Sequence, residues 1–264
     1  MVATFSLNFN ADFVFIKFGK EFLKMIDDIL YPDILPGHVL DQYLGDGWYR
    51  LGNLLFTSHI MEIDGKQCRL YWIRYNLTNL QWANLKKNAL AIVKRNRHFS
   101  VQLKKFELTD ELENLYALYQ PGTSFNSSAT INEYLDHKFS TGIFDTHVFE
   151  VRDGDQLIAA GIFDYGKESM AGIMNFYDPR YRKYSPGKFL IMLKIRHAMD
   201  RGIKYFYPGY IAYGNPMFDY KTFASDDSIE FYAPQAYCWF PYDLSLLRLI
   251  ENGEIILAPP DERM

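Results

Sequence analysis

A short basic segment at the start of an expected helix has residue types that could bind a phosphate group. Its four cations, between residues 180 and 188, are Arg180, Arg182, Lys183 and Lys188. Pro186 suits the first turn of a helix. The backbone N–H groups there, together with Ser185 and Gly187, could therefore hold a phosphate or a terminal ribose. The competing interpretation is a solvent-exposed turn decorated with charges.

A longer basic tract lies upstream, between residues 65 and 106, and contains no Asp or Glu. Its cations are Lys66, Arg69, Arg74, Lys86, Lys87, Lys94, Arg95, Arg97, Lys104 and Lys105. A run of one sign and this length is a candidate phosphate-binding face. The alternative is a solvated surface balanced by acids elsewhere, and the net charge of −4 keeps that alternative open.

Composition bounds the class of protein. The 264 residues suffice for one large domain, or for one domain with a smaller lobe. Cys68 and Cys238 are far apart and form no C-x-x-C pair, which argues against a disulfide framework and fits a reducing compartment. The histidines show no metal-ligand spacing, and no segment reads as a signal peptide or membrane span. We therefore expect a cytoplasmic protein with no metal, no cofactor and no membrane partner.

Hydrophobic periodicity and turn residues predict the order of elements. Helices are expected over residues 20–29, 38–44, 80–95, 110–119, 130–139 and 186–201. Strands are expected over residues 48–62, 66–75, 99–107, 146–152, 156–164, 170–177 and 203–207, and Asp64-Gly65 predicts a hairpin turn between the first two. The strands over 146–177 form an antiparallel meander.

The last meander strand, the helix over 186–201 and the strand over 203–207 form a β-loop-α-β unit. Such a crossover is right-handed and places its two strands parallel, and ligands bind at their carboxyl ends beside the helix N-terminus. Pro208 has no N–H and cannot extend the ladder. We expect the strands to part there and open a cleft, with an ordinary strand end as the alternative.

This order of elements resembles that of the GNAT acyltransferases, in which an acyl donor enters between these two strands. The resemblance implies an α/β (α+β) fold with a mixed, mostly antiparallel sheet flanked by helices. We expect a small N-terminal lobe with a β-hairpin over residues 1–78 and a GNAT-like aminoacyltransferase domain over residues 79–264.

Six short segments carry a more specific resemblance. Residues 47–52 read G-W-Y-R-L-G against G-x-x-R-x-G, and residues 94–97 read K-R-N-R against R-R-N-R. Residues 176–179 read F-Y-D-P against F-F-D-P, and residues 185–187 read S-P-G against S-L-G. Residues 207–211 read Y-P-G-Y-I against Y-L-G-Y-x-I, and residues 218–221 read F-D-Y-K against K-M-x-Y-K. In this order they resemble the arginyl- and leucyl-tRNA–protein transferases of the N-end rule pathway.

The resemblance implies transfer of Arg or Leu from charged tRNA to the N-terminal α-amine of a protein. Its partners would be aminoacyl-tRNA and protein or peptide N-termini, with Asp and Glu as candidate acceptors. The ester is already activated, and an α-amine with a pKa of about 7.7–8 is roughly one-tenth neutral at pH 7, so a strong base is not demanded. Positioning can then supply much of the rate.

The resemblance also implies roles for single residues. As catalytic residues, Lys221 would contact the tRNA or the ester carbonyl, Asp178 would orient the amine or accept its proton, and Tyr210 would line the cleft. Tyr220 would stack on the terminal adenine. A set of basic and small residues would bind substrate or tRNA: Arg50, Arg95, Arg97, Arg182, Lys183, Ser185, Gly187 and Lys188. Surface lysines, an Asp-Pro turn, core rings and structural ion pairs are the competing interpretations.

One departure from the family leaves other functions open. The family carries a C-x-x-C-x-x-C segment after the first motif, whereas residues 57–69 of this chain contain only Cys68. A cysteine-bound cofactor is therefore not expected. An acyl-CoA-dependent N-acyltransferase and a non-catalytic binder of RNA or N-termini on the same fold are the alternative functions.

Overall fold

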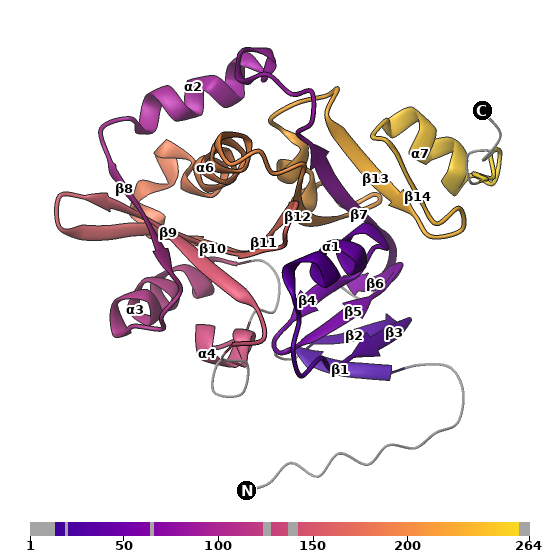
Figure 1. The fold of residues 1–264 in the computed structure, drawn as a ribbon, viewed down its shortest axis with the longest axis horizontal. Helices are drawn as coiled ribbons and strands as arrows, with labels where there is room; N and C mark the ends of the chain where they lie inside the picture. The colour runs from indigo at the N-terminus through magenta and orange to yellow at the C-terminus, as the bar shows by residue number, and fades with distance from the viewer. Residues whose placement is uncertain (1–13, 19–20, 64–65, 124–127, 137–141, 259–264) are drawn as a thin grey trace, which may run out of the picture.

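A long mixed sheet organises the chain in the computed structural model, which describes residues 14–18, 21–63, 66–123, 128–136 and 142–258 (Figure 1). Its main path follows the order β14-β13-β7-β12-β11-β10-β9-β8, and β6 pairs with β7 beside it. The strands are β6 (Ile60–Ile63), β7 (Lys66–Asn76), β8 (Ser100–Lys105), β9 (Asp145–Asp153), β10 (Gln156–Tyr165), β11 (Ser169–Tyr177), β12 (Tyr205–Ala212), β13 (Ile229–Ala233) and β14 (Cys238–Pro241).

Helices cover both faces of this sheet. On one face lies α6 (Pro186–Asp200), with α2 (Lys87–Asn96) packed beside it, and on the other lie α3 (Asp110–Tyr119) and α4 (Ile131–Leu135) (Figure 1). Alternating side chains of the meander feed the two cores, so Val148 packs with α3 and Phe149 packs with α6. Side-chain oxygens of Thr109 and Thr130 cap α3 and α4.

The first part of the described chain forms two small sheets. One pairs β1 (Val14–Phe18) with β2 (Glu21–Ile26), and the other has the order β3 (Asp28–Leu30), β5 (Leu54–Thr57), β4 (Tyr49–Leu51). Helix α1 (Gly37–Gly45) packs on the second sheet through Leu40 and Leu44. Helix α7 (Leu244–Glu251) covers β7 and β13 near the end of the large sheet that is formed by β14.

The expected fold class is confirmed: the sheet is mixed, mostly antiparallel and flanked by helices. The helix expected over residues 20–29 is wrong, because that segment hydrogen-bonds to β1 and β5 as β2 and β3. The strand expected over 48–62 is divided into β4, β5 and β6, with Gly52 in the left-handed region between the first two (φ +60°). The helix expected over 80–95 begins only at Lys87, after the 3-10 turn η1 (Trp82–Asn84).

The strands β11 and β12 run parallel and then part, as Pro208 predicts. They pair only from Ser169↔Tyr205 to Ala171↔Tyr207, so the pairing ends directly before Pro208. On its other side β12 pairs with β7, with a register shift between Phe206 and Gly209. Because proline offers no N–H to either neighbour, the ladder is interrupted at this residue. The large sheet is therefore split near its centre, between the two strands that the α6 crossover connects.

Strand β7 lies within the large sheet, between β12 and β13, and also pairs with β6 of the expected N-terminal lobe. The turn expected at Asp64-Gly65 falls outside the described residues, and β6 and β7 meet on either side of it through Ile63↔Lys66. The division of the chain at residue 78 stays a prediction, and β7 joins the two sides of it.

Gly47, in the first motif, has a backbone that other residues adopt at a cost. Its φ is +77°, and an added Cβ would lie 2.5 Å from Cδ1 of the buried Tyr232 ring. We expect Gly47→Ala to lower the free energy of unfolding by about 1–3 kcal/mol, measured by denaturant unfolding. Gly45→Ala is the matched control, since a Cβ at Gly45 meets nothing within 4 Å. Equal stability of the two variants would contradict this account of Gly47.

Candidate functional site

A cavity opens where β11 and β12 part. Its walls come from β11, from two side chains of α6, from β12 beside Pro208 and from the 3-10 segment that follows β12. The lining residues are Gly172, Ile173, Met174, Asn175, Ile191, Lys194, Phe206, Pro208, Tyr220 and Lys221. The lining includes two lysines and one asparagine and contains no Asp or Glu.

Lys221 reaches this cavity from the 3-10 segment η4 (Pro216–Thr222). Its Nζ donates a hydrogen bond to the carbonyl oxygen of Tyr210 (2.7 Å). The same Nζ lies 4.5 Å from the centroid of the Tyr210 ring and 4.7 Å from that of Phe218. Burial lowers the pKa of Lys221 to about 7, and the nearby Asp219 opposes that shift. The amine therefore exists in both protonation states near neutral pH and could exchange a proton with a bound group.

Tyr49 spans the split between the strands. Its hydroxyl bonds to the carbonyl oxygens of Gly172 in β11 and of Tyr207 in β12, the latter at 3.1 Å. Its ring stacks on Trp72 of β7, with centroids 5.1 Å apart. The side chain thus holds the edges of the cavity at a set separation. Tyr49 lies inside the first motif, but sequence reasoning singled out only its neighbour Arg50.

Tyr210 and Tyr220, both expected site residues, have their ring centroids 4.5 and 5.6 Å from Lys221 Nζ. Tyr210 is on β12, where its ring packs edge-on against Trp72 (5.5 Å) and tilted against Phe218 (5.2 Å). Tyr220 lines the cavity and is 40% exposed, so its ring is available at the opening. The structure brings Tyr210, Tyr220 and Lys221 together.

Asp178, expected near the reacting amine, is not among the cavity-lining residues. It is buried after β11, where it caps the 3-10 segment η3 (Pro179–Tyr184) by accepting from the Arg180 N–H (3.0 Å). Its carboxylate also accepts from the Arg180 guanidinium and from Gln156 Nε2 (3.3 Å). The Arg180 side chain lowers the pKa of Asp178. This geometry suits a structural turn and makes the carboxylate a weak proton acceptor.

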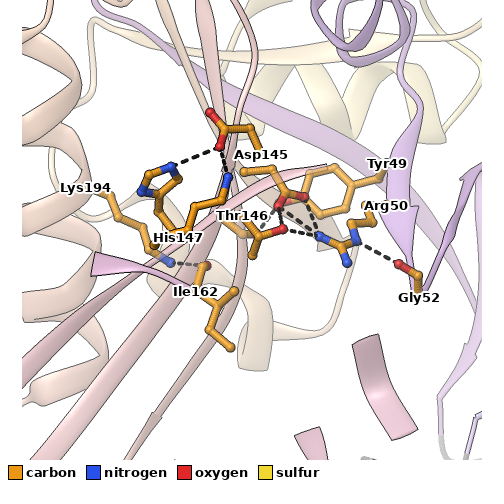
Figure 2. A network of polar contacts seen from close by, with 11 residues as sticks. Tyr49, Arg50, Gly52, Asp145, Thr146, His147, Ile162 and Lys194 are labelled. Atoms are coloured by element: carbon orange, nitrogen blue, oxygen red, sulfur yellow. Dashed lines mark hydrogen bonds and ion pairs between the residues drawn. The ribbon is translucent and has the colours of Figure 1, made fainter. Parts of the chain in front are cut away.

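Arg50 is buried in an ion pair, although a role in binding an acidic N-terminus or a phosphate was expected for it (Figure 2). Its Nη1 lies 2.9 Å from Asp164 Oδ1 and 2.9 Å from Thr146 Oγ1, and its Nε donates to the Gly52 carbonyl at 2.7 Å. The guanidinium also stacks over the Phe144 ring at 4.0 Å. These contacts tie β4 to the meander, and they already engage the guanidinium.

Some cations of the basic tract pair with acidic side chains, and others have no acidic partner among the described residues. Five of its cations pair with acids from elsewhere: Arg69 with Glu251, Arg74 with Glu230, Lys86 with Asp226, Lys104 with Glu150 and Lys105 with Asp145. Within the described ranges Lys87, Lys94, Arg95 and Arg97 form no ion pair, and all but the last lie on α2. Both interpretations of the tract therefore apply to different parts of it.

The cations of α2 without an acidic partner lie next to the basic segment over residues 180–188. Arg95 Nη1 donates to the carbonyl of Lys183 (3.2 Å), and the buried Asn96 side chain donates to the carbonyl of Tyr184 (2.9 Å). These bonds place α2 against η3, which carries the exposed Arg182 and Lys183. We call Lys94, Arg95, Arg97, Arg182 and Lys183 the basic face.

The remaining expected residues lie at the start of α6, directly after η3. Ser185 takes a left-handed conformation (φ +58°) and does not cap the helix with its side chain. Gly187 faces the Tyr177 ring, which an added Cβ would meet at 3.6 Å. Lys188 places its Nζ 5.3 Å from the centroid of the Phe223 ring. None of the three lines the cavity.

Lys194 is a cavity residue that sequence reasoning missed. It is fully buried on α6, and its Nζ donates to the carbonyl of Ile162 (2.8 Å; Figure 2). Burial lowers its pKa to about 7. The signal was present in the sequence, because a lone lysine interrupts the apolar run F-L-I-M-L-K-I of residues 189–195.

The sequence is similar to those of several known proteins. The family model described as "Arginine-tRNA-protein transferase, C terminus" matches residues 111–228, which include β11, α6, β12 and η4. The "Aspartate/glutamate leucyltransferase" of Leptospira interrogans is 27% identical over 216 residues, or 78% of this chain and 80% of that protein. The protein of the same name from Hyphomonas neptunium is 30% identical over 144 residues, or 52% of this chain and 57% of that protein.

Over these residues the chain is similar to the aminoacyl-tRNA–protein transferases, and the matches support the expected enzyme class, an aminoacyltransferase. The matched residues contain both walls of the cavity. Among solved structures, the C-terminal domain of a lysylphosphatidylglycerol synthetase from Agrobacterium fabrum has a TM-score of 0.40 and 16% identity, covering 55% of this chain and 48% of that one.

The buried ion pair gives a direct test of the role of Arg50. We expect Arg50→Met to lower the free energy of unfolding by about 3–5 kcal/mol, because Asp164 is left buried without its partner. Replacing both residues, as Arg50→Met with Asp164→Leu, should recover part of that loss. Denaturant unfolding measures both variants, with the exposed Arg97→Met as control. An Arg50→Met protein of unchanged stability that no longer binds acidic peptides would instead indicate the ligand-binding role.

Proposed function

We propose that the cavity between β11 and β12 is where an aminoacyl group passes from charged tRNA to the N-terminal α-amine of a protein. The observation that carries this proposal is the position of Lys221, which projects from a family-like motif into a cavity at the carboxyl end of two parallel strands. Ligands of open α/β sheets bind at such strand ends. The basic face lies on η3, directly before α6 in the chain, and on the neighbouring end of α2.

The reaction needs few protein groups. The α-amine nitrogen attacks the ester carbonyl carbon, the amide C–N bond forms, and the C–O bond to the terminal ribose breaks. The amine loses a proton, and the ribose oxygen leaves as a hydroxyl after gaining one. Lys221, with a pKa of about 7, is matched to relay that proton near neutral pH. Tyr210 holds its Nζ through the backbone carbonyl, and Tyr220 offers a ring to the terminal adenine.

The cavity lining favours leucine as the transferred residue. No lining residue is an acid that could pair with an arginine guanidinium. Both relatives named above are called aspartate/glutamate leucyltransferases, which supports leucine as donor and Asp or Glu as the accepting N-terminal residue. Arginine is the alternative donor.

Phosphate contacts supply the affinity for tRNA in this proposal. Lys94, Arg95, Arg97, Arg182 and Lys183 are exposed or half-buried and close together, as a backbone-binding surface requires. Binding through them weakens as salt rises, because bound counterions are released. A cytoplasmic location fits these substrates and stays a prediction. No helix among the described residues has the length and apolar character needed to cross a bilayer.

A transfer assay tests the proposed function. Purified protein is mixed with tRNA charged with labelled Leu, Arg or Phe and with peptides that begin with Asp, Glu, Lys or Arg. We expect label from leucyl-tRNA on the Asp and Glu peptides, and we expect transfer to fall as salt rises from 50 to about 200 mM.

Labelled acetyl-CoA is run beside the charged tRNAs as the control donor. Label from acetyl-CoA alone would indicate an acyl-CoA-dependent enzyme. Binding of tRNA or peptide with no transfer from any donor, by a folded sample, would indicate a non-catalytic binder.

Lys221 should act on turnover rather than on tRNA binding. We expect Lys221→Met to lower kcat by about 100-fold, the scale of one general acid–base group, with little change in KM for charged tRNA. The exposed Lys204→Met, which loses only an ion pair to Glu168, is the control and should keep the wild-type values. A Lys221→Met enzyme with unchanged kcat would remove the lysine from the mechanism.

A further inference from the structure

Asn175 and Lys194 form a pair at the wall of the cavity to which no role has been given. Strand β11 has a bulge beside them, because Ile162↔Met174 is followed by Phe163↔Gly172 in its pairing with β10 and Ile173 is left unpaired. A bulge interrupts the ladder and frees backbone groups. Lys194 occupies this place and donates to the carbonyls of Ile162 (2.8 Å) and Met174 (3.4 Å).

The third hydrogen bond of Lys194 decides how the Asn175 amide is turned. Nζ lies 2.9 Å from Oδ1 of Asn175. The lysine ammonium group and an amide nitrogen offer only donors, so the oxygen of Asn175 faces the charged Lys194. The –NH2 of the same planar group then points away from Lys194. In the described chain it has no hydrogen-bond partner, while Asn175 lines the cavity.

Two glycines leave the space that this pair needs. A Cβ on Gly161 would lie 3.0 Å from Asn175 Oδ1 and 3.3 Å from Lys194 Cε. A Cβ on Gly172 would lie 3.5 Å from Lys194 Nζ. Burial lowers the pKa of Lys194 to about 7. Its charged form has three N–H donors, one for each of the three oxygens that it faces, and this is the form that fixes the Asn175 amide.

We propose that the Asn175 –NH2 donates a hydrogen bond to the carbonyl oxygen of the transferred aminoacyl group, and that Lys194 positions Asn175 for this contact. The carbonyl oxygen gains negative charge when the α-amine attacks, and a preset donor stabilises that charge. Asn175 is thereby a substrate-binding residue and Lys194 a positioning residue. The inference rests on the proposed transfer reaction at the same cavity.

The test compares variants of the whole chain in the transfer assay. Asn175→Asp keeps the shape and the contact with Lys194 but replaces the donor by an acceptor. We expect its kcat to fall by about 100- to 1,000-fold, with KM for charged tRNA changed little. The exposed Asn84→Asp is the matched control and should behave as wild type. An Asn175→Asp enzyme with wild-type kcat would overturn the proposal.

The role of Lys194 can be tested separately, because the effect of its removal on kcat should depend on Asn175. We expect Lys194→Met to lower kcat by about 10- to 100-fold. In the Asn175→Ala background the same change should have little further effect, since the group that it positions is gone. Arg196→Met, on the exposed side of α6, is the control. Full additivity of the two losses would overturn the positioning role, and Asn175→Asp still tests the donor if Lys194→Met does not fold.

A binding measurement separates this inference from the proposed function. The probe is 3′-leucylamino-adenosine, in which a stable amide replaces the ester, and calorimetry measures its Kd. We expect Asn175→Asp to weaken binding about tenfold or more relative to wild type and Asn84→Asp. Binding by the wild type without any transfer activity would remove the proposed function alone. Equal binding by all three proteins, or none by the wild type, would overturn the role of Asn175.

Discussion

The missing N–H of Pro208 is the constraint on which the site depends. Two parallel strands that are joined by a crossover helix would ordinarily pair along their full length, and their backbone groups would fill the space between them. Here β11 and β12 pair over three residues each and then separate. The separation exposes backbone and side chains of both strands to one cavity. Tyr49 holds the parted edges through its hydroxyl, while Lys194 fills the bulge that the departing β11 contains.

Most polar side chains around the cavity already have hydrogen-bond or ion-pair partners. Residues with a purely structural role can therefore be distinguished from those that could still bind a substrate. Arg50 and Asp178 have the residue types expected of a site, but each is held by a buried or capping ion pair. Lys221 and the Asn175 amide keep unfilled donors beside the cavity. Charge type alone did not separate these cases, because it gives no information on which neighbours a side chain meets after folding.

Sequence reasoning located α1, β7 and most elements from α2 to β12, but not the strands β1 to β3. Periodicity and capping residues located α3, α6 and the meander, and the order of elements with Pro208 located the cleft. Residues 20–29 were misread because their strand partners lie elsewhere in the chain, and local propensity carries no information on pairing. Tyr49 and Lys194 were missed for a related reason: each acts through contacts with residues more than 15 positions away.

Strand β7 has a consequence for how the chain acquires its structure. Its residues, 66–76, pair with β12 over 205–212 and with β13 over 229–233, so neighbours in the sheet are separated by well over a hundred residues. During synthesis β7 leaves the ribosome long before either partner exists. Its apolar side chains, including Tyr71, Ile73 and Tyr75, lack their final contacts until those partners have been synthesised. Such non-local pairing slows folding and leaves an unpaired, aggregation-prone strand edge in the nascent chain.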